Sequence, residues 1–254
     1  MKIAGKVIAI TGAAGGIGAA LARRFNAEGA AGIALADLQE EALCAVAAEV
    51  DGIAVPTDVA KETEVQNFVA TTEAKYGPID IFCSNAGIAR MGSEHTADAL
   101  WQLNWDIHVM AHVYAARAVA GKMAERGTGY LVNTASAAGL LTHTDSATYA
   151  VTKHAAVALA EWLAIEYGDK GVRVSVLAPQ AVRTAMTAGR DGLVASVDGM
   201  IEADELADCV VRTMEEEKFL ILPHPIVANY MQRKVNDVDR WLSGMRRLKA
   251  KYSA

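Results

Sequence analysis

The chain alternates short runs of β-branched and apolar residues with longer segments of helical periodicity. The predicted strands are six near-continuous apolar runs, at residues 7–10, 32–36, 53–55, 79–83, 130–133 and 172–177. The predicted helices between them span residues 16–29, 39–50, 61–76, 98–125 and 147–169. Strands that are apolar along their whole length are typical of a parallel sheet covered on both faces. The alternation therefore predicts an open, doubly wound α/β sheet with helices on both sides.

Beyond residue 177 the alternation becomes less regular. Residues 185–203 have the composition of a loop, which we expect to act as a substrate lid. A helix at 203–217, a last strand at 219–222 and a closing helix at 226–250 are predicted to follow. The closing helix carries an apolar stripe that we expect to serve packing within or between subunits: Val235, Val238, Trp241, Leu242, Met245 and Leu248. No linker or internal repeat interrupts the chain, so we expect a single domain over residues 1–254.

Charge and cysteine content exclude several classes of protein. The 30 acidic and 24 basic residues leave a net charge of −6, which argues against a nucleic-acid-binding protein. The three cysteines, Cys44, Cys83 and Cys209, are too few and too scattered for a disulfide framework or a zinc site, and no metal is expected. No signal peptide and no apolar run of membrane-spanning length is visible. We therefore expect a cytoplasmic protein without membrane contact.

A glycine-rich turn follows the first predicted strand, with the sequence Thr-Gly-Ala-Ala-Gly-Gly-Ile-Gly at residues 11–18. Gly12 would permit the tight turn, Gly16 would let the backbone approach a pyrophosphate, and Gly18 would let the next helix pack on the sheet. The first turn of that helix, which includes Ile17, would offer free N–H groups to phosphates. The turn predicts a dinucleotide site, with an ordinary structural turn as the alternative.

Asp37 ends the second predicted strand, 19 residues after Gly18. A carboxylate at this position can accept hydrogen bonds from both hydroxyls of the adenosine ribose and would repel a 2′-phosphate. Its neighbours Ala13, Ala14 and Leu38 carry no compensating positive charge. Asp37 therefore predicts NAD rather than NADP as the cofactor. The alternative is that Asp37 caps the helix at 39–50.

Tyr149 and Lys153 lie four residues apart in the predicted helix 147–169, which places them on one helical face. Ser136 precedes Tyr149 by 13 residues and follows the predicted strand 130–133. It would therefore stand at the carboxyl edge of the sheet, where open α/β sheets bind ligands. Together with the glycine-rich turn, these three residues predict a catalytic site at this edge of the sheet.

With these motifs, residues 5–186 resemble the short-chain dehydrogenase/reductase family. The resemblance implies a single Rossmann-type domain of about seven parallel strands in the order 3-2-1-4-5-6-7. It also implies that Asp58 and Val59 contact the adenine, and that Val182 and Thr184 hold the nicotinamide carboxamide. The positions implied to bind the cofactor are Gly12, Gly16, Ile17, Gly18, Asp37, Asp58, Val59, Asn85, Ala86, Gly87, Tyr149, Lys153, Pro179, Val182 and Thr184.

The resemblance also implies a mechanism for Ser136, Tyr149 and Lys153. Hydride would pass between the nicotinamide and a carbinol carbon, while a proton passes between the substrate oxygen and Tyr149. A phenol with a pKa of about 10 is a poor base at neutral pH, so the Lys153 ammonium is expected to favour the phenolate. Ser136 would donate a hydrogen bond to the substrate oxygen.

The family usually carries a further active-site asparagine, and alignment of the apolar spacing places His108 at that position. His108 could join a proton relay, because an imidazole titrates near neutrality, or it could be a hydrogen-bonded core histidine. A second difference is Gln180, which follows Pro179 where relatives usually have glycine. Both differences leave Val182 and Thr184 in their expected spacing.

The residues expected to meet the substrate are mostly small or apolar, and they include Ala138, His143 and Met186. They favour a hydrophobic secondary alcohol or ketone. The predicted activity is therefore NAD-dependent interconversion of the two. Alternatives are an epimerase or dehydratase on the same scaffold and a non-catalytic NAD-binding protein. The long helices 98–125 and 147–169 could pair across a two-fold axis, which predicts a homodimer or homotetramer.

Overall fold

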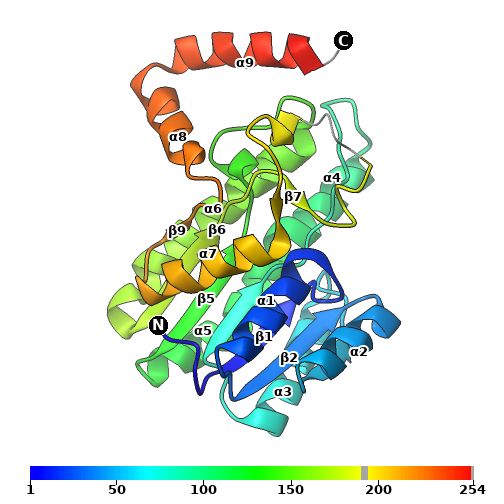
Figure 1. The fold of residues 1–254 in the computed structure, drawn as a ribbon, viewed down its shortest axis with the longest axis vertical. Coiled ribbons are helices and arrows are strands. Elements are labelled where there is room, and N and C mark those ends of the chain that lie inside the picture. Colours follow the sequence, from blue (N-terminus) through cyan, green and yellow to red (C-terminus); the bar gives the residue numbers. More distant parts are fainter. Residues whose placement is uncertain (190–193, 253–254) are drawn as a thin grey trace.

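The computed structural model describes residues 1–189 and 194–252. Its main sheet consists of seven parallel strands in the order β3-β2-β1-β4-β5-β6-β9 (Figure 1). These strands are β1 (Val7–Thr11), β2 (Gly32–Asp37), β3 (Ile53–Pro56), β4 (Ile81–Ser84), β5 (Gly129–Thr134), β6 (Val172–Leu177) and β9 (Leu220–Ile221). Because β9 is the seventh strand of this sheet along the chain, the predicted order is confirmed.

Helices cover both faces of the sheet, as predicted. One face is covered by α1 (Gly16–Ala27), α2 (Glu40–Glu49) and α7 (Ala203–Glu215). The other is covered by α3 (Glu62–Tyr76), α5 (Ala111–Glu125) and α6 (Ala147–Tyr167). None of the helices in the described part of the chain is both long and apolar enough to cross a membrane.

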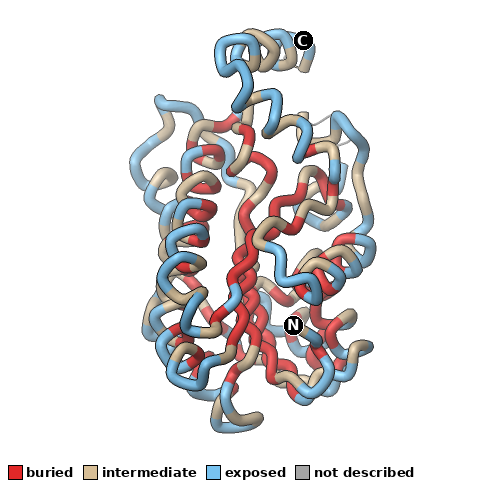
Figure 2. The backbone as a smooth tube through the Cα atoms, turned by 90° about the vertical axis from the view of Figure 1, so that its left-hand side faces the viewer, coloured by how far each residue is buried: buried red, intermediate tan, exposed pale blue. Residues whose placement is uncertain are grey.

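The two covered faces explain why the strands lack an alternating polar pattern. In β1, Ile8 and Ile10 pack into the core on one side of the sheet, whereas Val7 and Ala9 pack into the core on the other. Successive side chains of a strand point to opposite faces, so both sets must be apolar. Figure 2 shows these buried strands in the middle of the molecule, with more exposed helices around them.

The predicted helix 98–125 is continuous in extent but changes its winding in the middle. It consists of α4 (Asp98–Trp105), a π-helical segment (Asp106–Met110) and α5. His108 lies in the π-helical segment and is fully buried. Segments of π-helix are rare in proteins. Those that occur are often found at functional sites.

The expected lid segment is tied together at its two ends. The short strands β7 (Val182–Arg183) and β8 (Ile201–Glu202) pair in parallel and form a separate two-stranded sheet that the sequence did not predict. Between them lies a short 3-10 helix (Val194–Ser196). Part of the predicted lid, residues 190–193, lies outside the described residues.

The prediction of one closing helix at 226–250 is wrong. The segment forms two helices, α8 (Ile226–Asn236) and α9 (Val238–Tyr252), which lie at an angle to each other (Figure 1). Asp237 separates them with extended backbone angles (φ −157°, ψ 93°). Its Oδ1 accepts a hydrogen bond from the Arg240 N–H at 2.9 Å. Aspartate favours this capping arrangement, and the periodic apolar pattern across the break concealed it.

Candidate active site

A cavity of about 1420 Å³ opens at the carboxyl ends of the parallel strands. Every predicted site residue lines this cavity except Gly18 and His108. The predicted residues that line it are Gly12, Gly16, Ile17, Asp37, Asp58, Val59, Asn85, Ala86, Gly87, Ser136, Ala138, His143, Tyr149, Lys153, Pro179, Val182, Thr184 and Met186. Residues distant in the sequence are thus brought together in one space, as the topology of an open α/β sheet favours.

Three glycines of the glycine-rich turn, Gly12, Gly16 and Gly18, have almost no space for side chains. Gly12 has a positive φ of 66°, and a Cβ atom there would lie 2.7 Å from the Cα of Ala86. A Cβ atom on Gly16 would lie 3.1 Å from the Cγ2 of Thr184. Gly18 lies behind the cavity wall, where a Cβ would lie 2.1 Å from the Gly12 carbonyl oxygen. The turn therefore keeps bare backbone at the cavity and fixes α1 tightly against it.

The Asp37 carboxylate is held at the rim of the cavity by two backbone groups. Its Oδ2 accepts a hydrogen bond from the Ala14 N–H, and its Oδ1 accepts one from the Gln39 N–H, each at 3.1 Å. The second bond reaches Gln39, the residue before α2, and no side chain caps the first N–H groups of that helix, so the structure does not favour the alternative capping role. Each oxygen retains a further lone pair for a ligand.

These features fit a nicotinamide adenine dinucleotide. The first N–H groups of α1 have no partner within the helix and lie beside the bare backbone of Gly16, which suits a pyrophosphate. The neighbouring Leu38 is 70% exposed and apolar, so it offers no charge to a 2′-phosphate. The site therefore combines N–H groups that could bind phosphates with a carboxylate that could accept hydrogen bonds from a ribose.

Asn85 holds the ends of three strands in register at the cavity floor. Its backbone N–H donates to the Thr11 hydroxyl at 2.9 Å, and its side-chain amide donates to the Thr11 carbonyl at 3.1 Å. The Thr134 hydroxyl donates to the Asn85 side-chain oxygen at 3.1 Å. The position of the glycine-rich turn on β1 is thereby coupled to β4 and to β5, the strand that leads to Ser136.

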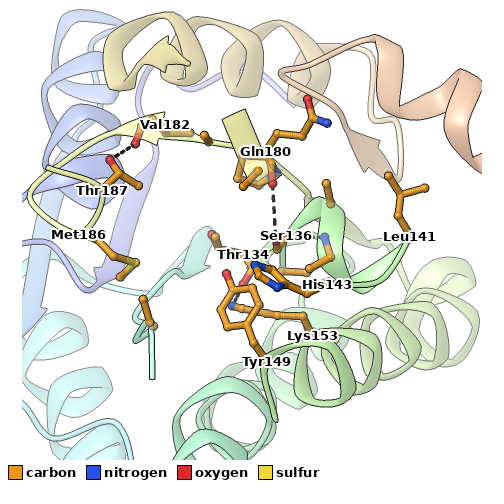
Figure 3. Close-up of a pocket in the computed structure, with 18 of the residues that line it drawn as sticks. Thr134, Ser136, Leu141, His143, Tyr149, Lys153, Gln180, Val182, Met186 and Thr187 are labelled. Carbon is orange, nitrogen blue, oxygen red and sulfur yellow. Dashed lines mark hydrogen bonds between the residues drawn. The ribbon is translucent and has the colours of Figure 1, made fainter. Parts of the chain in front are cut away.

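Tyr149 and Lys153 project from the first turns of α6 toward Thr134 and Ser136 (Figure 3). The helix begins after Ser146, whose hydroxyl accepts a hydrogen bond from the Tyr149 N–H at 3.1 Å. Lys153 donates from Nζ to the Thr134 carbonyl at 3.0 Å and lies 5.7 Å from the centroid of the Tyr149 ring. The predicted Tyr/Lys pair thus faces one space.

Ser136 is oriented by its own loop. Its hydroxyl oxygen accepts a hydrogen bond from the Ala138 N–H at 3.1 Å and donates to the Pro179 carbonyl at 3.4 Å. Figure 3 shows the second bond at the cavity wall, beside the Tyr149 and Lys153 side chains. The long bond to Pro179 is the one that Ser136 can exchange for a bond to a substrate oxygen.

The electrostatics differ from the expectation that Lys153 lowers the pKa of Tyr149. Burial raises the pKa of the Tyr149 phenol, and a hydrogen bond with Ser136 opposes that rise. Burial also lowers the pKa of Lys153 to about 7, because its ammonium loses solvation. In the protein alone, Tyr149 is therefore a protonated phenol at neutral pH, and Lys153 is near its midpoint of charge.

Two histidines hold the Tyr149 ring edge-on. The ring centroids of His108 and Tyr149 are 5.4 Å apart with planes at 87°, and those of His143 and Tyr149 are 5.8 Å apart at 74°. Sequence reasoning predicted His143 as a substrate contact and missed its contact with Tyr149. Only the fold brings the loop of His143 and the π-helical segment of His108 to the same ring.

His108 is fixed by hydrogen-bonding contacts at both ring nitrogens, of which only one carries a proton in the neutral ring. Its Nδ1 lies 2.9 Å from the Thr152 hydroxyl, and its Nε2 lies 3.0 Å from the carbonyl of Ile88. Burial, and then the nearby charge of Lys153, lower the pKa of His108 to about 2. The ring is therefore neutral at physiological pH, which favours the hydrogen-bonded core histidine over the proton relay, the two alternatives for this position.

His112 lies one helical turn beyond His108 and is also buried, with a pKa that burial lowers to about 3. In the unfolded chain both histidines take up protons below a pH of about 6.5, whereas the native protein does not. Unfolding therefore binds protons, and stability falls as pH falls from about 6.5 toward 5. We expect each histidine to contribute up to ~1.4 kcal/mol per pH unit to that slope.

The measurement is urea unfolding of wild type and His112→Phe at several pH values between about 5 and 7.5. His112→Phe is expected to reduce the slope of unfolding free energy against pH by up to ~1.4 kcal/mol per pH unit, which corresponds to one proton fewer bound on unfolding. Identical slopes for the two proteins would contradict the buried, neutral state of His112.

The largest group of cavity residues that sequence reasoning missed comes from α8 and α9. The predicted apolar stripe at 226–250 was assigned to packing, yet Trp241, Met245 and Leu248 line the cavity. Trp241 also packs against the cluster around Leu141 and Val227. Helical spacing indicated that these residues share a face, but it contained no signal for what that face covers.

Comparison with known proteins identifies a family and individual relatives that the chain resembles. Residues 6–192 match the family described as short chain dehydrogenase. The 1-deoxy-11-beta-hydroxypentalenate dehydrogenase of Streptomyces exfoliatus is 32% identical over 257 residues, which cover 96% of this chain and 92% of that relative. The likeness therefore extends over the C-terminal helices as well as the nucleotide-binding part.

Solved structures show the same arrangement of elements. A short chain dehydrogenase/reductase from Burkholderia phymatum in complex with NAD is similar, with a TM-score of 0.84, 26% identity and coverage of 94% of this chain and 96% of that one. A short-chain dehydrogenase from Sphingobium yanoikuyae in complex with NADPH has a TM-score of 0.79, 26% identity and coverage of 93% and 94%. Since proteins with either cofactor share the fold, the choice of cofactor depends on individual side chains.

Proposed function

The chain belongs to the short-chain dehydrogenase family, and on that premise we propose that it is an NAD(H)-dependent oxidoreductase interconverting a secondary alcohol and a ketone. One observation carries the proposal. Tyr149, Lys153 and Ser136 line the same cavity as the bare backbone of Gly16 and the carboxylate of Asp37. A reacting group bound beside the phenol would therefore share its space with a dinucleotide held by the turn.

The protein's part in ketone reduction follows from the state of its side chains. Tyr149 is a general acid, because burial keeps its phenol protonated at neutral pH. Ser136 donates to the same substrate oxygen and stabilises the negative charge that develops there. Lys153 lies close enough to stabilise the negative charge of the phenolate that forms when Tyr149 gives up its proton. A bound nicotinamide would supply the hydride.

A hydrophobic substrate is supported by the cavity wall near Tyr149. Ala138, Leu141 and Met186 all line it, and the predicted lid contributes Val194 and Val197. We propose that the lid segment closes over the substrate and excludes water. A screen of apolar secondary alcohols and ketones with NAD(H) and NADP(H), followed by nicotinamide absorbance, tests the reaction, its direction and the cofactor together.

Cofactor choice gives a specific prediction at Asp37. Wild type is expected to use NADH over NADPH by on the order of 100-fold in kcat/KM, because a carboxylate beside a 2′-phosphate costs several kcal/mol. Asp37→Asn removes the charge but keeps one acceptor oxygen for the Gln39 N–H. Its preference for NADH should fall by about tenfold or more. Equal use of the two cofactors by wild type would refute the role of Asp37.

The proposed homo-oligomer is supported by apolar side chains on the outer faces of two helices. On α6, Trp162 is 56% exposed and Ile165 is 81% exposed. On α4, Leu103 and Trp105 are each about two-fifths exposed. Large exposed apolar residues on neighbouring helices are typical of surfaces that a second subunit covers.

A further inference from the structure

The far side of the cavity is formed by the two C-terminal helices, which lie beyond the body of the domain (Figure 1). Their cavity-lining residues are Tyr230, Arg233, Asn236, Asp237, Arg240, Trp241, Gly244, Met245, Arg247 and Leu248. Three of these ten residues are arginines and one is a carboxylate. This positive end is a local feature, because the whole chain has a net charge of −6.

The arginines of α9 stand beside an apolar surface. Arg240, Gly244 and Arg247 follow one another at spacings of four and three residues and share one side of the helix. Trp241 and Met245 lie next to them and also line the cavity. The part of the wall formed by α9 therefore combines apolar side chains with two arginines.

The three guanidinium groups have no carboxylate partner within residues 1–189 and 194–252. Other arginines of the chain do, for example Arg23 with Glu49 and Arg173 with Glu217. The Arg233 guanidinium lies over the Tyr230 ring, 5.6 Å from its centroid, and Arg240 donates only its backbone N–H, to Asp237. These groups are thus available to a ligand.

Two carboxylates, Asp145 and Asp237, also line this part of the cavity. Asp237 accepts the backbone bond that starts α9. Asp198 does not line the cavity, and its carboxylate is hydrogen-bonded to the Tyr230 hydroxyl and the Gln180 amide, each at 2.9 Å. The acidic groups are partly occupied within the protein, whereas the guanidinium groups are not.

The end of α8 that carries Arg233 is anchored to the loop after Ser136 through the next residue. That residue, Lys234, donates from Nζ to the carbonyls of Leu140 and Leu141, both at 2.9 Å. Those carbonyls belong to the loop that follows Ser136. The end of α8 is therefore anchored to the wall of the reaction site, so a group bound by Arg233 has a defined distance from Tyr149.

From this arrangement, and resting on the proposed oxidoreductase function, we propose that the natural substrate is an amphiphile with a carboxylate at the end remote from the reacting carbon. Arg233 and Arg240 bind that carboxylate, with Arg247 about two helical turns beyond Arg240 on α9. The apolar body of the substrate lies against Trp241, Met245 and Leu141. Guanidinium groups suit this task because they pair with carboxylates through two parallel hydrogen bonds.

The test uses methyl ketones with a terminal carboxylate, from 4-oxopentanoate to 10-oxoundecanoate, and the methyl ester of each. Reduction by wild type with NADH is expected to favour the acid over its ester by about 10- to 100-fold in kcat/KM at the chain length that spans the cavity. Raising the salt concentration should weaken the preference for the acid.

Two variants assign the preference to the proposed residues. Arg233→Gln and Arg240→Gln are expected to lose most of the acid preference while reducing the esters as wild type does. Arg246→Gln is the matched control. Arg246 lies on α9, as Arg240 does, but it does not line this cavity, and its guanidinium donates to the Ser243 hydroxyl. Its acid preference should equal that of wild type, and the KM for NADH should be the same in all four proteins.

The outcomes separate the inference from the function on which it rests. Equal use of acids and esters by wild type at every length overturns the inference and leaves the oxidoreductase function standing. The same acid preference in Arg240→Gln and Arg246→Gln also overturns it. If no ketone or alcohol is turned over, the proposed function fails. Calorimetric binding of octanoate, compared with 1-octanol in wild type and Arg240→Gln, then decides whether the anion site exists.

Discussion

Tyr149→Phe is expected to reduce turnover by about 100- to 10,000-fold, the usual contribution of a positioned general acid. The variant keeps the ring, so its edge-on contacts with His108 and His143 remain. It loses only the hydroxyl that exchanges a proton with the substrate oxygen. Steady-state kinetics with the best substrate from the alcohol and ketone screen give the loss, and fluorescence titration gives NADH affinity, which should change little.

Tyr130→Phe is the matched control for this substitution. The Tyr130 hydroxyl is buried in the core and hydrogen-bonded to Ser175 at 2.8 Å, away from the cavity. Removing it should cost stability on the order of 1 kcal/mol and leave kcat near the wild-type value. Comparable kcat for Tyr149→Phe and Tyr130→Phe would remove the basis for the proposed mechanism.

Gly18→Ala adds a single methyl group and is expected to lower both folding stability and NADH affinity. The new Cβ would lie 2.1 Å from the Gly12 carbonyl oxygen and 2.9 Å from the Cα of Ala13. Both are backbone atoms, so no side chain can rotate away to make room. We expect a loss of about 1–3 kcal/mol or more in unfolding free energy, together with weakened NADH binding as the turn moves.

Gly15→Ala provides the comparison within the same turn. A Cβ on Gly15 meets nothing within 4 Å, and its φ of −176° suits any residue. Urea unfolding should place this variant within about 0.5 kcal/mol of wild type. If Gly18→Ala were as stable as Gly15→Ala and bound NADH equally well, the close packing of α1 against the turn would not be needed for the site.

Much of the fold follows from local chemistry. The near-continuous apolar runs at Val7–Thr11 and Gly32–Asp37 require cover on both faces, which favours a parallel sheet with helices on each side. The glycines at 12, 16 and 18 can be interpreted from sequence because their function depends on missing side chains at fixed spacing. The Tyr149–Lys153 pair is equally visible, because four residues make about one helical turn.

Two features of the active site became clear only in three dimensions. His108 was placed by alignment, but its neutral state depends on burial beside Lys153 and on bonds to Thr152 and Ile88. The direction of the Tyr149 pKa shift is likewise decided by burial, which outweighs what the neighbouring residue types suggest. Solvation is a property of the assembled site, so sequence spacing could not give it.

The same division holds at the C-terminus. Sequence by itself determined that residues 226–250 are helical and that one side is apolar, because both properties depend on neighbours within a few positions. Only the tertiary structure decided that Asp237 breaks the helix and that Trp241 and Arg240 face the cavity. Where a helix face comes to lie depends on the loops and packing that precede it, and these long-range contacts leave no periodic signal in the chain.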